Sequence, residues 1–176
     1  MPLEKVRWED LKSHLIPGSQ YLNKITNSQF FEIYRGNFEK YSPNMNVLGQ
    51  MKAWFSQNLE ELRIVILGAE WCPDCQRNGA ALLKIELILN DPTFRLFFLS
   101  GVKTNPLRRT KTDIHWAVPP SPPEVNDPKF AVKAIPMIYL FLREGQCIGL
   151  ITENPSHTKT IEEELMFYLN SADKIN

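Results

Sequence analysis

The hydrophobic pattern of the first 60 residues has the three-to-four-residue spacing of amphipathic helices. Pro17-Gly18 and Ser42-Pro43 interrupt this pattern as turn signals. We interpret the one-sided stripe, which is rich in aromatic residues, as the buried face of helices rather than as a binding surface. Its members are Trp8, Leu11 and Leu15, then Phe30, Tyr34, Phe38 and Tyr41, and then Val47, Leu48, Met51, Trp54 and Phe55.

The pattern changes at residue 62, where short apolar runs replace the helical spacing. Residues 62–67 (Leu-Arg-Ile-Val-Ile-Leu) predict a strand buried on both faces, and residues 94–99 predict a second strand. Between them, apolar residues at helical spacing predict a helix that ends near Asn90-Asp91-Pro92. A strand, a helix and a strand in this order form a βαβ unit, in which the strands are parallel and the crossover is right-handed.

The C-terminal part predicts two more strands and a helix. Residues 138–142 and 147–151 have the composition of strands, and a short loop containing Gly145 joins them. A final helix is predicted after Pro155, with Thr160 and Glu163 at the spacing of a capping box. Together these elements predict an α/β fold with a central mixed sheet flanked by helices.

Two segments depart from this regular pattern. Residues 100–128 lack a clear periodicity and contain a proline-rich run, and loops of this length are usually functional or mobile. We predict that this segment is an insertion in a domain spanning residues 44–176. Residues 1–43 would then form a helical N-terminal extension.

Composition and charge narrow the classes of function. The 176 residues are 43% hydrophobic and 23% charged, as in ordinary globular domains. Lysine plus arginine equals aspartate plus glutamate at 20 each, so the zero net charge favours neither nucleic acid nor a membrane surface as partner. No apolar run reaches the roughly 20 residues of a transmembrane helix, and the N-terminus lacks a signal-peptide pattern. We therefore expect a cytoplasmic protein.

The cysteine spacing carries the most chemical information. Cys72 and Cys75 follow a predicted strand and open a predicted helix. A Cys-x-x-Cys motif supplies either half of a zinc site or a reversible dithiol. Because Cys147 is isolated and the three histidines are dispersed, zinc would need distant ligands to converge. The dithiol interpretation is favoured, with no metal and no cofactor beyond a redox-active Cys72–Cys75 disulfide.

The position of the motif assigns a role to each cysteine. Pro73 falls in the first helical turn, where its missing N–H group costs nothing. Cys72 then lies at the helix N-terminus, where free N–H groups and the helix dipole stabilise a thiolate. We expect Cys72 to attack a substrate disulfide and Cys75 to displace the reduced substrate sulfur. Asp74 either tunes the thiolate or serves only as a favourable first-turn residue.

The motif Trp-Cys-Pro-Asp-Cys at residues 71–75, directly after an apolar strand, resembles the active site of the thioredoxin superfamily. It is similar to that of small thioredoxin-related proteins that carry the same pentapeptide. Residues 129–141 resemble the thioredoxin segment that leads into the cis-proline and the following strand. The resemblance covers about residues 60–170 and implies a thioredoxin fold, with Pro136 as the cis-proline facing the cysteines.

The resemblance also implies a function and a substrate site. The expected activity is thiol–disulfide oxidoreduction, directed toward reduction of protein disulfides because cytosolic thiols are kept reduced. The partners would be a protein or small-molecule disulfide and an unidentified reductant. The backbone of Ile135 would pair with an extended substrate, and Trp71 would form the surface beside Cys72. The expected substrate-binding residues are Trp71, Pro73, Asp74, Ile135 and Pro136.

The sequence also departs from the thioredoxin pattern. Thioredoxins carry a buried aspartate six residues before the first cysteine, where it assists proton transfer from the second cysteine, and here that residue is Ile66. No counterpart to the opening strand of the fold is evident. These departures and the N-terminal extension favour an alternative, a thioredoxin-fold protein-binding or redox-sensing module with weak or no catalytic activity.

Overall fold

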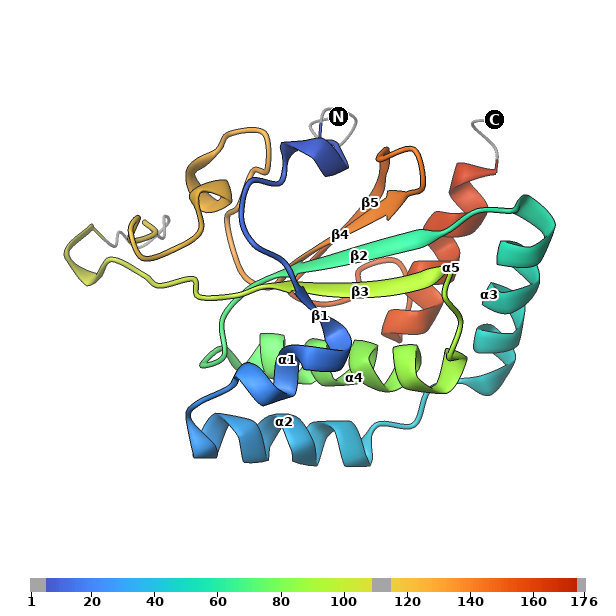
Figure 1. Ribbon diagram of the computed structural model, residues 1–176, viewed down its shortest axis with the longest axis horizontal. Helices are drawn as coiled ribbons and strands as arrows, with labels where there is room; N and C mark the ends of the chain where they lie inside the picture. Colours follow the sequence, from blue (N-terminus) through green and yellow to red (C-terminus); the bar gives the residue numbers. More distant parts are fainter. Residues whose placement is uncertain (1–5, 109–114, 174–176) are drawn as a thin grey trace.

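A computed structural model describes residues 6–108 and 115–173, and a five-stranded mixed sheet forms its centre (Figure 1). The strand order is β1-β3-β2-β4-β5. The β2 and β3 strands are parallel, whereas the β1–β3, β2–β4 and β4–β5 pairs are antiparallel. Helix α4 connects the parallel pair, so the predicted βαβ unit is confirmed. The strands are β1 (Ile16–Pro17), β2 (Leu62–Leu67), β3 (Phe94–Leu99), β4 (Met137–Leu142) and β5 (Cys147–Thr152).

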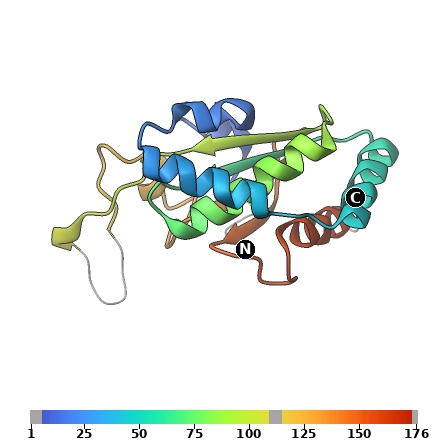
Figure 2. The same ribbon diagram turned by 90° about the horizontal axis from the view of Figure 1, so that it is seen from below.

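The helices gather on one face of the sheet and at one end of it. Helices α1, α2 and α4 lie below the sheet in Figure 1, and Figure 2 shows α2 running beside α4. Helices α3 and α5 pack against each other near the far end of the sheet. The helices are α1 (Gly18–Lys24), α2 (Ser28–Lys40), α3 (Met45–Asn58), α4 (Pro73–Leu89) and α5 (Ile161–Ala172).

The sheet separates two hydrophobic cores because successive side chains of a strand point to opposite faces. In β2, Ile64 and Ile66 pack into the core beneath the helices, whereas Val65 and Leu67 belong to the opposite core. Irregular segments cover that second face, and they lie above the sheet in Figure 1. The predicted α/β class with a mixed sheet and flanking helices is confirmed, and the helices concentrate on one side.

The helix expected around Trp8, Leu11 and Leu15 is wrong. Only Trp8–Asp10 forms a single turn of 3-10 helix, and the segment lies along the second face of the sheet. The Trp8 ring meets the rings of Phe97 and Phe141 edge-on, with centroid distances of 5.4 and 5.6 Å. The apolar spacing that resembled a helix comes from contacts between an extended chain and the sheet.

The remainder of the predicted N-terminal extension combines helices with a short edge strand. Helices α1 and α2 form within it, but β1 pairs with β3 and thus joins the central sheet. Tyr21 and Tyr34 are buried in the same core as α4. Residues 1–5 lie outside the described residues, and the separation of residues 1–43 from the rest of the domain stays a prediction.

The predicted insertion at residues 100–128 contains short 3-10 turns at Pro106–Arg108 and Pro123–Asn126, and its residues 109–114 lie outside the described part. The buried carboxylate of Glu124 accepts hydrogen bonds from the backbone N–H groups of Lys12 and Ser13, at 2.7 and 2.9 Å. These bonds join the insertion to the N-terminal segment. Within residues 6–108 and 115–173, no helix has the length and apolar character that crossing a bilayer requires.

Candidate functional site

Cys72 is the N-cap residue of α4, and Pro73 is the first residue of the helix. The backbone of Cys72 is extended, and its carbonyl oxygen accepts a hydrogen bond from the N–H group of Gln76 at 3.0 Å. Its sulfur accepts the N–H group of Cys75 at 3.4 Å. The sulfur of Cys72 therefore occupies the place where a serine or aspartate oxygen usually caps a helix.

A loop far away in the sequence faces this helix start. The Ile135–Pro136 peptide bond is cis, and the Cys72 thiol donates a hydrogen bond to the Ile135 carbonyl oxygen at 3.6 Å. The carbonyl oxygen of Pro136 in turn accepts the N–H group of Glu153 at 2.8 Å. The structure thus brings Ile135 and Pro136 next to the cysteine motif, where the resemblance expects them.

The two cysteines differ in their electrostatic surroundings. Hydrogen bonding from Cys75, first through its side chain and then through its N–H group, lowers the pKa of Cys72 to about 7. The same side-chain bond, together with burial, raises the pKa of Cys75. The geometry therefore favours ionisation of Cys72 before Cys75, which keeps its proton at neutral pH.

Trp71 and Pro73 are the exposed residues of the motif, and the two cysteines are buried. Trp71 is 43% exposed, whereas Cys72 and Cys75 are 6% and 1% exposed. The indole N–H of Trp71 donates to the carbonyl oxygen of Val102 at 3.0 Å, which fixes the ring beside the motif. A cavity of about 390 Å³ borders this ring, with Phe30 and Lys103 among its lining residues.

The buried side of Cys75 contains residues that the sequence analysis did not single out as functional. A Cβ atom on Gly68 would lie 2.7 Å from the Cys75 sulfur, so the thiol rests directly on the strand-end backbone. The Tyr34 hydroxyl donates to the Cys75 carbonyl oxygen at 3.3 Å, and the Tyr21 hydroxyl lies 3.3 Å from that of Tyr34. The sequence analysis placed Tyr34 in the buried aromatic stripe, and the spacing of that stripe does not indicate that the Tyr34 hydroxyl contacts the motif.

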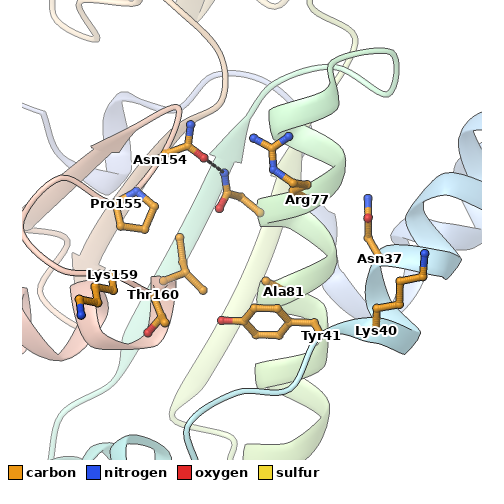
Figure 3. A pocket seen from close by; sticks show the side chains of 11 residues that line it. Asn37, Lys40, Tyr41, Arg77, Ala81, Asn154, Pro155, Lys159 and Thr160 are labelled. Carbon is orange, nitrogen blue, oxygen red and sulfur yellow. Dashed lines mark hydrogen bonds between the residues drawn. The ribbon is translucent and has the colours of Figure 1, made fainter.

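A second cavity, of about 360 Å³, opens beside the dithiol helix (Figure 3). Arg77, which lines it, forms an ion pair with Asp74 inside the motif. Asn78 donates to the carbonyl oxygen of Glu153 at 2.6 Å and to the Asn154 side-chain oxygen at 3.3 Å. The remaining lining residues come from α2 and the residue after it (Asn37, Lys40 and Tyr41), from α4 (Ala81), and from the chain that leads into α5 and the first residue of that helix (Pro155, Lys159, Thr160 and Ile161).

The third cysteine lies apart from the motif in β5. The Cys147 thiol donates to the Gly149 carbonyl oxygen at 3.4 Å, and burial raises the pKa of Cys147 to about 11. Across the described part of the chain, no three His, Cys, Asp or Glu side chains are grouped closely enough to share a metal ion. The zinc interpretation of the motif therefore gains no additional ligands from this arrangement.

Comparison with solved structures shows the fold. A protein of unknown function from Pseudomonas aeruginosa superposes with a TM-score of 0.65 at 16% sequence identity, over 97% of this chain and 99% of the other. An HIV epitope-scaffold superposes with a TM-score of 0.58, also at 16% identity, over 93% of this chain and 88% of its own. At such identity the likeness concerns the fold alone.

Comparison with known sequences and with family models adds evidence beyond the fold. No curated protein sequence matches the chain significantly. A family model described as thioredoxin matches residues 25–118, which is more than half of the chain and includes both cysteines of the motif. Together with the mixed sheet and the helix that starts at the cysteine motif, this match shows that the chain belongs to the thioredoxin family.

Proposed function

We propose that the protein is a thiol–disulfide oxidoreductase that reduces protein disulfides, with Trp-Cys-Pro-Asp-Cys as its redox motif. One observation carries this proposal. Cys72 caps the N-terminus of α4 next to the cis Ile135–Pro136 bond, and Cys75 lies buried in the following turn. This arrangement gives an attacking sulfur with a stabilised thiolate and a second sulfur shielded from solvent.

The reaction follows in two steps. The Cys72 thiolate attacks one sulfur of a substrate disulfide, which forms a mixed disulfide and releases the other substrate sulfur as a thiolate. Cys75 then loses its proton and attacks the Cys72 sulfur, which forms the Cys72–Cys75 disulfide and releases the second substrate thiolate. Two electrons pass from the dithiol to the substrate, and an external dithiol reductant, acting in the cytoplasm, returns them.

The surroundings of Cys72 support a role in binding an extended substrate. While Cys72 is a thiol, its S–H group occupies the Ile135 carbonyl oxygen. When the thiolate forms, that donor disappears, and the carbonyl is free to accept a substrate N–H group. Pro136 and the exposed ring of Trp71 would flank the same strand of substrate, while Pro73 and Asp74 would border it from α4.

Reduction of insulin by dithiothreitol tests the proposal. We expect the wild-type protein to accelerate the reaction and Cys72→Ser to abolish the acceleration. When the pre-reduced protein is mixed with insulin without dithiothreitol, Cys75→Ser should retain the first step and accumulate a mixed disulfide, because the motif then has no second sulfur to displace the bound one. Cys147→Ser is the matched control and should behave as wild type. Full activity of Cys72→Ser would contradict the proposal.

A second candidate is a thioredoxin-fold binding module, and the cavity of Figure 3 favours it. That cavity carries Lys40, Arg77 and Lys159 beside a motif that lacks the usual buried aspartate. A binding module would retain its partner when both motif cysteines are replaced by serine. A pull-down that compares this double variant with wild type separates the two functions.

A further inference from the structure

A tight turn at the end of β5 contacts both the cis-proline loop and the dithiol helix. It is a three-residue γ-turn, in which the Asn154 N–H group donates to the Thr152 carbonyl oxygen at 2.7 Å. Glu153 is its central residue and has a φ of 60°, in the left-handed region that residues other than glycine rarely adopt. Because such a strained backbone persists only where its surroundings hold it, the contacts of Glu153 must keep the turn in place.

Both backbone groups of Glu153 are hydrogen-bonded to the candidate site. Its N–H group donates to the Pro136 carbonyl oxygen at 2.8 Å, and its carbonyl oxygen accepts the side-chain N–H group of Asn78 at 2.6 Å. The same amide nitrogen of Asn78 also donates to the Asn154 side-chain oxygen at 3.3 Å, along the dashed line in Figure 3. One side-chain amide of α4 thus holds the turn at two points.

The position and burial of Asn78 suit it to this contact. It lies in α4 almost one helical turn after Cys75, and it is only 8% exposed. Burying an amide costs free energy unless its N–H groups find acceptors, and both acceptors of the Asn78 amide belong to the turn. Because Cys72 caps the same helix, the Asn78 amide ties the turn to the element that carries the attacking sulfur.

These contacts complete a closed ring that includes the attacking sulfur. Along α4 the ring leads from Cys72 to Asn78, and the backbone of Glu153 joins Asn78 to Pro136. The adjoining carbonyl oxygen of Ile135 then returns to the Cys72 thiol at 3.6 Å. In the proposed function this carbonyl oxygen accepts a substrate N–H group. The placement of that acceptor relative to Cys72 therefore depends on the Asn78 contact.

We propose that Asn78 is a positioning residue, which places the Ile135–Pro136 loop relative to Cys72 for an extended peptide and so favours peptide disulfides over small ones. A peptide disulfide gains a hydrogen bond from its backbone to the loop, whereas a small disulfide without N–H groups gains only the reaction with Cys72. Misplacing the loop therefore slows the peptide selectively, because a bound substrate reacts fast only when it is correctly oriented. This inference rests on the proposed oxidoreductase function.

Single-turnover oxidation of the reduced protein by two disulfides tests the proposal. One is the disulfide-linked dimer of a short alanine peptide with a central cysteine, and the other is hydroxyethyl disulfide, which has no N–H group. Both react with the same Cys72 thiolate, so a changed Cys72 pKa or a partly unfolded sample cancels in the ratio of the two rate constants. For Asn78→Ala we expect the peptide-to-small-disulfide ratio to fall roughly threefold to tenfold, the size of one lost hydrogen bond.

Asn58→Ala is the matched control, because the Asn58 amide also donates to a backbone carbonyl oxygen, that of Trp54 at 2.9 Å, but in α3. It should leave the ratio at its wild-type value. If Asn78→Ala does not fold, Asn78→Ser, whose hydroxyl is one bond shorter than the amide, replaces it with the same expected fall. An unchanged or higher ratio would overturn the proposal, even if both rate constants fall together. If the wild type reacts with neither disulfide, the oxidoreductase function is refuted instead.

Discussion

At the scale of single residues, one hydrogen-bonded contact separates the properties of two identical side chains. The contact between Cys75 and Cys72 lowers the pKa of Cys72 and raises that of Cys75. Because the helix N-terminus offers free N–H groups to Cys72 only, the asymmetry follows from position rather than from residue type. The first turn of α4 thus favours Cys72 as the attacking sulfur and Cys75 as the sulfur that displaces the substrate.

The reactivity of Cys72 should follow its pKa. We predict that the rate of alkylation by iodoacetamide rises with pH to half its maximum near pH 7, the pKa of Cys72. Cys75→Ala removes the side-chain hydrogen bond, which is the largest cause of the lowered pKa, and should move this midpoint upward. Cys147→Ala should not move it. An unshifted midpoint in Cys75→Ala would show that the contact does not set the pKa.

Gly68 supports the buried sulfur at close range. Gly68→Ala places a methyl group 2.7 Å from the Cys75 sulfur, so we predict a loss of about 1–3 kcal/mol in the free energy of unfolding, the usual cost of overpacking. Gly36→Ala is the control, because its Cβ meets no atom within 4 Å inside α2 and should stabilise slightly. Urea denaturation of the reduced proteins measures both. Equal stability of the two variants would contradict the close contact.

At the scale of elements, strong periodic patterns are what the sequence reveals best. The strands over residues 62–67 and 94–99 and a final helix after Pro155 form as the patterns predict, because the strands are short, mostly apolar runs and the helix carries its own cap at Thr160. The edge strand Ile16–Pro17 is only two residues long and includes a proline, so no periodic signal could identify it. The segment around Trp8 was wrongly predicted as a helix because its apolar side chains pack on the distant sheet rather than on a helix face.

In the candidate site, too, the sequence reveals the local motif but not the contacts between distant elements. Cys72 and Cys75 are adjacent in sequence, so their spacing alone indicated a dithiol. The Tyr34 hydroxyl reaches the Cys75 carbonyl oxygen from α2, 41 residues earlier in the chain, and its ring packs on Gly79. Such a contact depends on how α2 lies against α4, which hydrophobic spacing does not encode.

The turn that precedes α5 depends on one buried carboxylate. Glu164 is fully buried and accepts hydrogen bonds from the N–H groups of Ser156, His157 and Thr158 and from the His157 and Thr158 side chains. Burial opposes the charge of Glu164, but these bonds outweigh it and leave its pKa lowered. Because the pKa of Glu164 is lower in the folded state than in the unfolded state, its charge stabilises the fold at any pH above the unfolded-state pKa. This stabilisation is lost as the pH falls through the folded-state pKa.

Replacing this carboxylate should therefore lower the free energy of unfolding at neutral pH and make that free energy depend less on pH in the acid range. For Glu164→Gln we predict a loss of about 2 kcal/mol in the free energy of unfolding at neutral pH, since bonds to a charged acceptor are lost. The difference from wild type should shrink as the pH falls below about 4, where the unfolded carboxyl is protonated. Glu39→Gln, at an exposed ion pair with Arg35, should change little. Urea denaturation across this pH range measures both variants.

At the scale of the whole molecule, the two faces of the sheet are covered by different kinds of structure. Helices cover the face that contains Ile64, and irregular segments cover the face that contains Val65. The cysteines of the motif belong to the second core, whereas Tyr21 and Tyr34 belong to the first. The dithiol therefore lies where the two cores meet at the end of β2.

The irregular segments over the second face, residues 8–15 and 123–127, should open together when the hydrogen bonds that join them are removed. Glu124 joins two segments more than 100 positions apart through Lys12 and Ser13, with a further bond from the Ser13 hydroxyl at 2.6 Å. For Glu124→Gln we predict faster amide hydrogen exchange in residues 8–15 and 123–127, because a charged acceptor of three bonds is replaced. Exchange in α4 should remain as in wild type. Unchanged exchange in both segments would contradict this account.

The central claim is that Cys72 and Cys75 form a reversible redox pair. The most direct test equilibrates the protein with dithiol–disulfide buffers of graded potential and counts free thiols by trapping and mass analysis. For a reductase we predict a single two-electron transition of the Cys72–Cys75 pair at about −270 mV, with Cys147 reduced throughout. If no Cys72–Cys75 disulfide forms at any potential, the claim is contradicted.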